Sequence, residues 1–146
     1  MKFHRLNYYK AAPDVAKALL DMENALAASR IEKPLQDLVK IRVSQINGCA
    51  FCVNLHTREA SKAGESVRRL FALGTWEETT FFNERERAAL KWAETLTLVA
   101  ERRAPEPVYN EVAAHFSERE MVELTFAITT INAWNRFGIG FAAHPE

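Results

Sequence analysis

The chain has 146 residues, and its 19 Lys and Arg side chains balance 19 Asp and Glu side chains, so its formal net charge is zero. A chain of about 150 residues can bury roughly two-thirds of its unfolded surface, which suffices for one compact domain without disulfides or a structural metal. Hydrophobic residues make up 48% of the sequence and charged residues 26%, which excludes a disordered or low-complexity chain. We therefore expect a single domain over residues 1–146.

The neutral charge balance also argues against strongly charged partners. Nucleic acids and anionic membranes attract proteins through a positive field, which this chain lacks. No apolar run approaches the roughly 18 residues of a membrane span, and no signal-peptide core follows the first residues. We expect a cytoplasmic protein that binds neither nucleic acid nor membrane. Because cytoplasmic thiols are kept reduced, its two cysteines indicate catalysis or metal binding rather than a structural disulfide.

Pro and Gly divide the chain into segments whose apolar residues recur with the helical period rather than the strand period. Proline at a first helical position and glycine after a last one mark several of the boundaries. These signals predict helices over residues 13–29, 34–47, 49–63, 66–73, 83 to the prolines at 105 and 107, 108–116, and a long one from 117. The sequence therefore predicts an all-α fold of about seven helices.

Two of these helix starts carry a second signal. Asn83 with Glu86, and Ser117 with Glu120, have the spacing of a capping box, in which each side chain bonds the backbone of the other residue. Residues 74–82, by contrast, are aromatic and Thr-rich without clear periodicity. We predict that they form a packed connection.

Both cysteines lie in the segment Cys49-Ala50-Phe51-Cys52, and His56 follows one turn later. Helical positions three, four and seven apart share a face, so these three side chains project together. Cys49 falls at a predicted helix N-terminus, where unpaired N–H groups favour the thiolate. His56 can accept a thiol proton or, once charged, hold Cys52 as an ion pair. Such a pair can reduce a peroxide through a sulfenic acid and a disulfide that a cellular dithiol reopens.

Other interpretations of the cysteine pair remain open. The two thiols can be buried structural residues. A closed zinc site usually takes four ligands, and only the scattered His4, His115 and His144 could complete it. A c-type haem needs His directly after the second Cys, where this chain has Val53, and a thioredoxin-like motif would follow a strand. We expect no metal, haem or other cofactor.

The run from Asp37 to Cys52, with His56 after it, resembles the AhpD-like alkylhydroperoxidases of the carboxymuconolactone decarboxylase superfamily. Residues 82–90 and 131–136 are similar to later helices of the same family, so the resemblance covers about residues 34–141. It implies an all-helical fold that assembles as homotrimers or homohexamers. It also implies that Cys52 is the attacking thiol, Cys49 its disulfide partner and His56 the proton acceptor.

The chain departs from the family pattern at two places. A glutamate twelve residues before the first Cys completes a proton relay in the family, and this chain has the shorter Asp37 there. Asp37 is alternatively an exposed carboxylate that stabilises a helix N-terminus. A His between the cysteines of the family is replaced by Ala50 or Phe51. Four residues later in the chain are candidates to wall the site or a subunit contact, and a structural role is the simpler expectation for all of them: Asn132, Trp134, Asn135 and Arg136.

The function that we expect is thiol-dependent reduction of organic hydroperoxides or hydrogen peroxide by Cys49, Cys52 and His56, with an unidentified cellular dithiol as reductant. One alternative is a disulfide switch or electron-transfer adaptor that uses the same thiols. A decarboxylase of the carboxymuconolactone type is a weaker alternative, because that reaction has no need of two thiols at redox spacing.

Overall fold

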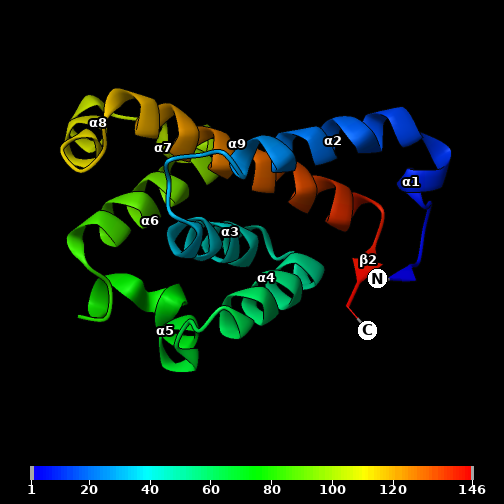
Figure 1. Ribbon diagram of the computed structural model, residues 1–146, viewed down its shortest axis with the longest axis horizontal. Helices are drawn as coiled ribbons and strands as arrows, with labels where there is room; N and C mark the ends of the chain where they lie inside the picture. Colours follow the sequence, from blue (N-terminus) through cyan, green and yellow to red (C-terminus); the bar gives the residue numbers. More distant parts are fainter. Residues whose placement is uncertain (1, 146) are drawn as a thin grey trace.

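The computed structural model describes residues 2–145, which form nine α-helices, one 3-10 helix and one pair of short β-strands (Figure 1). In chain order the elements are β1 (Lys2–Phe3), α1 (Tyr8–Ala11), α2 (Pro13–Leu26), α3 (Lys33–Asn47), α4 (Ala50–Lys62), α5 (Val67–Ala72), the 3-10 helix η1 (Leu73–Glu78), α6 (Glu84–Thr97), α7 (Val99–Arg102), α8 (Glu106–Ala113), α9 (Glu118–Gly140) and β2 (Ala143–His144). The predicted all-α class is confirmed, and the helices pack as one compact domain.

The described residues contain more short elements than the sequence predicts. The helices α1 and α7 have four residues each, and one turn is too short to show an apolar repeat. The predicted connection over residues 74–82 includes most of η1, a tight helix of the kind that often links longer ones. The strands β1 and β2 pair antiparallel through two residues each, which gives no alternating pattern. The pairing joins the two ends of the described chain.

Both predicted capping boxes are present. Asn83 accepts the N–H of Glu86, and Glu86 accepts the N–H of Asn83, at the start of α6. Ser117 and Glu120 make the same reciprocal pair at the start of α9. Each box satisfies two of the backbone donors that a helix start leaves unpaired, so these two boundaries are set locally.

The helix α3 lies in the middle of the fold and is buried all round between residues 35 and 41. It packs against α4, α6 and α9 (Figure 1). A helix that is enclosed on every side also buries the polar residues it carries. In α3 these include Gln36, Asp37 and Lys40, which are 5%, 2% and 3% exposed.

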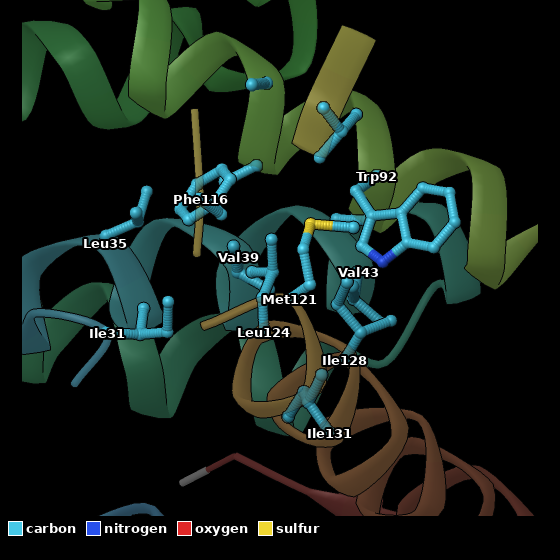
Figure 2. Packing of buried hydrophobic residues seen from close by; sticks show 14 of the residues in the cluster. Ile31, Leu35, Val39, Val43, Trp92, Phe116, Met121, Leu124, Ile128 and Ile131 are labelled. Atoms are coloured by element: carbon cyan, nitrogen blue, oxygen red, sulfur yellow. The ribbon is translucent and has the colours of Figure 1, made fainter. Parts of the chain in front are cut away.

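Buried apolar side chains form two clusters on different faces of α3. The first cluster joins α3 to α4, α6, α8 and α9, and Figure 2 draws 14 of its residues. It consists of Ile31, Leu35, Val39, Val43, Cys49, Cys52, Ala88, Ala89, Trp92, Ala93, Val112, Phe116, Met121, Leu124, Ile128 and Ile131. The second cluster joins α3 to α4, α5, η1 and α6 and consists of Leu38, Ile41, Ala60, Leu70, Leu73, Trp76, Phe82 and Leu90. Both cysteines belong to the first cluster.

A glycine in the left-handed conformation ends α3 and begins the turn into α4. Gly48 has φ of 70°, which a residue with a Cβ adopts at a cost. Its N–H donates to the carbonyl of Gln45, and the N–H of Cys49 donates to the carbonyl of Ser44. The chain reverses here, so α4 folds back against α3.

The N-terminal helix α1 lies beside the last turns of α9 (Figure 1). The ring centroid of Tyr8 lies 5.1 Å from that of Phe137 and 5.5 Å from that of Phe141. The 23 residues of α9 make it the longest helix of the described chain. Within residues 2–145, no helix combines the length and apolar character needed to cross a membrane.

Candidate functional site

The two thiols lie at the start of α4, beneath α9. Cys49 is the N-cap residue of α4, and its Sγ accepts the backbone N–H of Cys52 at 3.4 Å. The two Sγ atoms share a hydrogen bond at 2.7 Å, and both cysteines are free thiols. Their exposed fractions are 2% and 4%. The two cysteines therefore lie together, as their spacing predicts, and Cys49 lies at the helix N-terminus, as predicted.

The helix α9 closes over the sulfurs at a glycine. A Cβ on Gly138 would lie 3.1 Å from Sγ of Cys49 and 3.8 Å from Sγ of Cys52. Three residues earlier, Asn135 is fully buried; its amide donates to Oγ of Ser44 at 3.0 Å and its carbonyl oxygen accepts the amide of Asn47 at 2.8 Å. This network fixes α9 against the C-terminal end of α3, next to the dithiol.

Hydrogen bonding separates the acidities of the two thiols. The hydrogen bond from Cys52, helped by backbone N–H groups and Asn135, lowers the pKa of Cys49 to about 7 against the opposing effect of burial. The same hydrogen bond, burial and the neighbouring charge raise the pKa of Cys52. The pair therefore loses one proton near neutral pH and retains the second between the sulfurs.

A cavity of about 250 Å³ lies beside the dithiol and is lined by Cys52. Its lining combines aromatic and aliphatic side chains with a few polar ones: Tyr8, Tyr9, Leu20, Glu23, Phe51, Cys52, Leu55, His56, Glu59, Trp134 and Gly138. Cys52 is part of this wall and Cys49 is not. A molecule in the cavity therefore meets Cys52 first.

His56 lies on the same cavity wall, one helical turn after Cys52. Its Nδ1 is 3.3 Å from Oε2 of Glu59. Burial lowers the pKa of His56, the positive charge of Lys40 lowers it further, and Glu59 and Glu23 oppose the shift. The imidazole is therefore uncharged at neutral pH and can accept a proton.

A buried ion pair lies beside His56. The ammonium of Lys40 in α3 pairs with Glu23 of α2, and the Lys40 side chain is only 4% exposed. Glu23 is also a wall of the cavity, with 35% of its side chain exposed. The pair brings one positive and one negative charge to the edge of the site.

The structure does not bring Asp37 to this cavity. Asp37 pairs with Lys33 one turn away and lines a different cavity beside Ala60 and Gly64. It is 2% exposed, so the alternative expectation of an exposed carboxylate is wrong. The reason is that α3 is enclosed on every side at this point, which buries even a residue of its second turn.

Histidines do not complete a metal site around the thiols. His4 and His144 lie together where β1 pairs with β2, with ring centroids 4.6 Å apart. Across residues 2–145, no three or more His, Cys, Asp or Glu side chains are grouped so that they could hold a metal ion. The zinc alternative therefore has no ligand set in the part of the chain described.

Sequence reasoning missed the titratable residues around His56, namely Tyr8, Tyr9, Glu23, Lys40 and Glu59. Only Glu59 gave a local signal, because it follows His56 at i+3 on the same helix face. The others come from α1, α2 and α3, and nothing in a single sequence relates those helices to α4. Asn135 and Trp134, which were expected to have structural roles, contact the thiol pair and line the cavity respectively.

Comparisons with known proteins identify the family and agree with the fold. The family model "Carboxymuconolactone decarboxylase family" matches residues 13–95. The uncharacterized protein YdfG of Bacillus subtilis (strain 168) is 42% identical over 135 residues, which cover 92% of this chain and 92% of that protein.

Two solved structures are similar in fold. ATU0492 from Agrobacterium tumefaciens, a protein of unknown function described as a candidate antioxidant defence protein AhpD, has a TM-score of 0.94 at 41% identity, and the match covers 99% of each chain. An AhpD core from Ralstonia eutropha JMP134, an uncharacterized peroxidase-related protein, has a TM-score of 0.83 at 16% identity and covers 94% of this chain and 74% of that one.

The family model spans more than half of the chain, and YdfG is similar along nearly all of it. The arrangement of helices is shared at the level of the fold with the AhpD core. The chain therefore belongs to the carboxymuconolactone decarboxylase family and has its AhpD-like fold.

Proposed function

We propose that this protein is a thiol-dependent hydroperoxide reductase that cycles between a Cys49–Cys52 dithiol and a disulfide. One observation carries the proposal: Cys52 faces the cavity, and the sulfur of Cys49 lies directly behind it at 2.7 Å. A reagent in the cavity reaches one sulfur, and the second sulfur is placed to capture the oxidised product. The description of the A. tumefaciens structure as an antioxidant defence protein supports this class of reaction.

In the first half of the cycle, Cys52 reduces the hydroperoxide ROOH. His56 accepts the thiol proton, the thiolate attacks one peroxide oxygen, and an S–O bond forms as the O–O bond breaks. Sulfur is oxidised to the sulfenic acid, and the leaving alkoxide takes the proton from His56 to become the alcohol ROH. The lowered pKa of His56 supports its role as acceptor because the ring begins the step uncharged.

In the second half, Cys49 attacks the sulfur of the sulfenic acid. The thiolate of Cys49 forms the S–S bond, the S–O bond breaks, and the leaving hydroxide takes a proton from the solvent to become water. A cellular dithiol then reduces the disulfide and is itself oxidised. Each cycle converts one hydroperoxide and one dithiol into an alcohol, water and an oxidised dithiol.

The proton shared by the sulfurs links the two halves. The resting charge lies on Cys49, whose pKa is about 7, while the accessible sulfur belongs to Cys52. When His56 takes the proton that Cys52 shares with Cys49, a charge forms on the accessible sulfur, where a substrate can be attacked, and Cys49 stays a thiolate for the second half. The aromatic walls formed by Tyr9, Phe51 and Trp134 favour an organic hydroperoxide over hydrogen peroxide.

Two parts of the proposal rest on the family resemblance and on composition. The family resemblance implies a homotrimer or homohexamer. The neutral composition, and thiols that need a reducing environment, fit a cytoplasmic protein. Asp37 has no step in the proposed cycle, because it lines a cavity of its own.

Steady-state consumption of cumene hydroperoxide with dithiothreitol or dihydrolipoamide tests the proposal. The wild type is expected to turn over many times and Cys52→Ser not at all. Cys49→Ser is expected to consume one equivalent and to leave a sulfenic acid on Cys52, which dimedone traps for mass spectrometry. His56→Ala is expected to slow turnover at neutral pH by about 10²-fold, a typical effect of removing a general base.

The two cysteine variants serve as matched controls for each other, because each loses one sulfur from the same pair. Full activity in Cys52→Ser would show that the nucleophile is assigned wrongly. Consumption of a single equivalent by the wild type, with reductant in excess, would favour a disulfide switch or electron-transfer adaptor over an enzyme.

A further inference from the structure

The buried Lys40 has no role in the proposed dithiol–disulfide cycle, yet it lies beside the cavity in which that cycle takes place. Its side chain is 4% exposed, and its ammonium pairs with Glu23, which lines the cavity. Burying an ammonium in this enclosed helix carries a desolvation cost that a methionine would avoid. A purely structural role therefore explains this residue poorly.

Groups that affect the charge of His56 come from several of the helices around it. The titratable or charged groups facing it are Tyr8 and Tyr9 from α1, Glu23 from α2, Lys40 from α3, and Cys52 and Glu59 from α4, whereas α9 contributes the uncharged Trp134 and Gly138. Lys40 is the cation of this set. It is also the group that the fold encloses most completely, so its charge is screened least by water.

We propose that Lys40, held by Glu23, is a positioning residue that keeps the His56 ring uncharged, and that Glu59 orients this ring so that the proton relay from Cys52 runs through His56 and Glu59 rather than through Asp37. This inference rests on the proposed function. Nδ1 of His56 lies 3.3 Å from Oε2 of Glu59, so the carboxylate favours the tautomer with its proton on Nδ1, and this tautomer leaves Nε2 with the lone pair that accepts the Cys52 proton. An imidazolium ring is disfavoured before the reaction by burial and, in addition, by the positive charge of Lys40.

The fold explains why Lys40 takes this place and Asp37 does not. The chain reverses at Gly48, so successive turns of α3 toward its N-terminus lie beside successively later turns of α4. Lys40 is thereby brought to His56, whereas Asp37 lies one turn further along, beside Ala60.

The His56 pKa, measured by NMR titration of the imidazole resonances, tests the inference without any peroxide. Lys40→Met removes the charge and keeps the length of the side chain, and Lys40→Arg keeps the charge. Since the cation lowers the His56 pKa, Lys40→Met should raise it and Lys40→Arg should restore it. Glu59→Gln removes an opposing charge and should lower it. Lys33→Met is the matched control, because Lys33 belongs to the same helix and pairs with Asp37 instead.

Hydroperoxide turnover gives the second readout. In Lys40→Met the acid limb of the pH profile should move to higher pH. The rate should fall at least about tenfold near pH 6 and recover in alkaline solution, because a protonated His56 cannot act as base. The inference would be overturned if the acid limb of the pH profile moved in Asp37→Asn but not in Lys40→Met. That result would favour a proton relay through Asp37.

The two readouts separate this inference from the proposed function. If no variant or wild type turns over hydroperoxide and the His56 pKa still follows the charge at residue 40, the proposed function fails and the positioning role stands. If turnover is normal and the His56 pKa is the same in Lys40→Met, Lys40→Arg and wild type, the inference fails and the proposed function stands.

Discussion

At the scale of single residues, the chemistry depends on a proton shared by two sulfurs. The helix start alone predicts an acidic Cys49, because a thiolate there accepts unpaired backbone N–H groups. The structure adds that the hydrogen bond from Cys52 is the larger cause of the lowered pKa. Sequence could place both cysteines on one face, but the 2.7 Å between the sulfurs depends on the side-chain conformations that the surrounding packing selects.

A titration can separate the two causes. In Cys52→Ala the side-chain donor is lost, so the pKa of Cys49 should return from about 7 toward the ordinary thiol value. That return would reduce the thiolate present at pH 7 roughly tenfold. Cys52→Ser keeps a hydroxyl donor and should shift the pKa less. The rise of thiolate absorbance near 240 nm with pH measures both variants. An unchanged midpoint in Cys52→Ala would assign the acidity to the helix N-terminus alone.

At the scale of elements, the helix α9 determines how closely the sulfurs are covered. Its approach depends on Gly138, which has no positive φ and is required for space alone, since a Cβ there would be 3.1 Å from Sγ of Cys49. Asn135, one turn earlier, holds the same face of α9 against α3. The buried amide of Asn135 and the absence of a Cβ at Gly138 thus belong to the same contact between α9 and α3.

Paired glycine substitutions in α9 test this contact. Gly138→Ala should destabilise the reduced protein by about 1–3 kcal/mol, because a buried sulfur must move to admit the methyl group. Gly140→Ala is the matched control: a Cβ there meets nothing within 4 Å, so the change should be neutral or stabilising by up to about 1 kcal/mol. Urea denaturation measures both. Equal stability of the two variants would mean that α9 shifts easily and that the close approach is not a constraint.

At the scale of the whole molecule, local and long-range features differ in how far they could be predicted. The starts of α6 and α9 were predictable because Asn83 and Ser117 bond residues within their own first turns. The face shared by Cys49, Cys52 and His56 was predictable because helical spacing alone defines it. The contact of Lys40 with Glu23 joins two helices, and its place beside His56 depends on how α4 folds back on α3. No pattern within one segment encodes such a contact.

The central position of α3 leads to a prediction about cooperativity. Val39 and Val43 pack in the first cluster, whereas Leu38 and Ile41, on the same helix, pack in the second cluster. Loss of order in α3 must therefore disrupt both clusters, and the described domain should unfold as one unit. Leu38→Ala, at a fully buried position of the second cluster, should reduce the free energy of unfolding by about 2–5 kcal/mol.

The same substitution should weaken α9, which packs on the first cluster and contains Leu124, Ile128 and Ile131. Hydrogen exchange of the α9 amides measures this, and their protection should fall by the free energy that denaturation reports for the whole protein. Leu6→Ala removes the same atoms from a side chain that is 55% exposed, and should change stability by about 0.5 kcal/mol or less. Wild-type protection of α9 in Leu38→Ala would show instead that the two clusters open independently, and that α3 does not couple the dithiol end of the molecule to the rest.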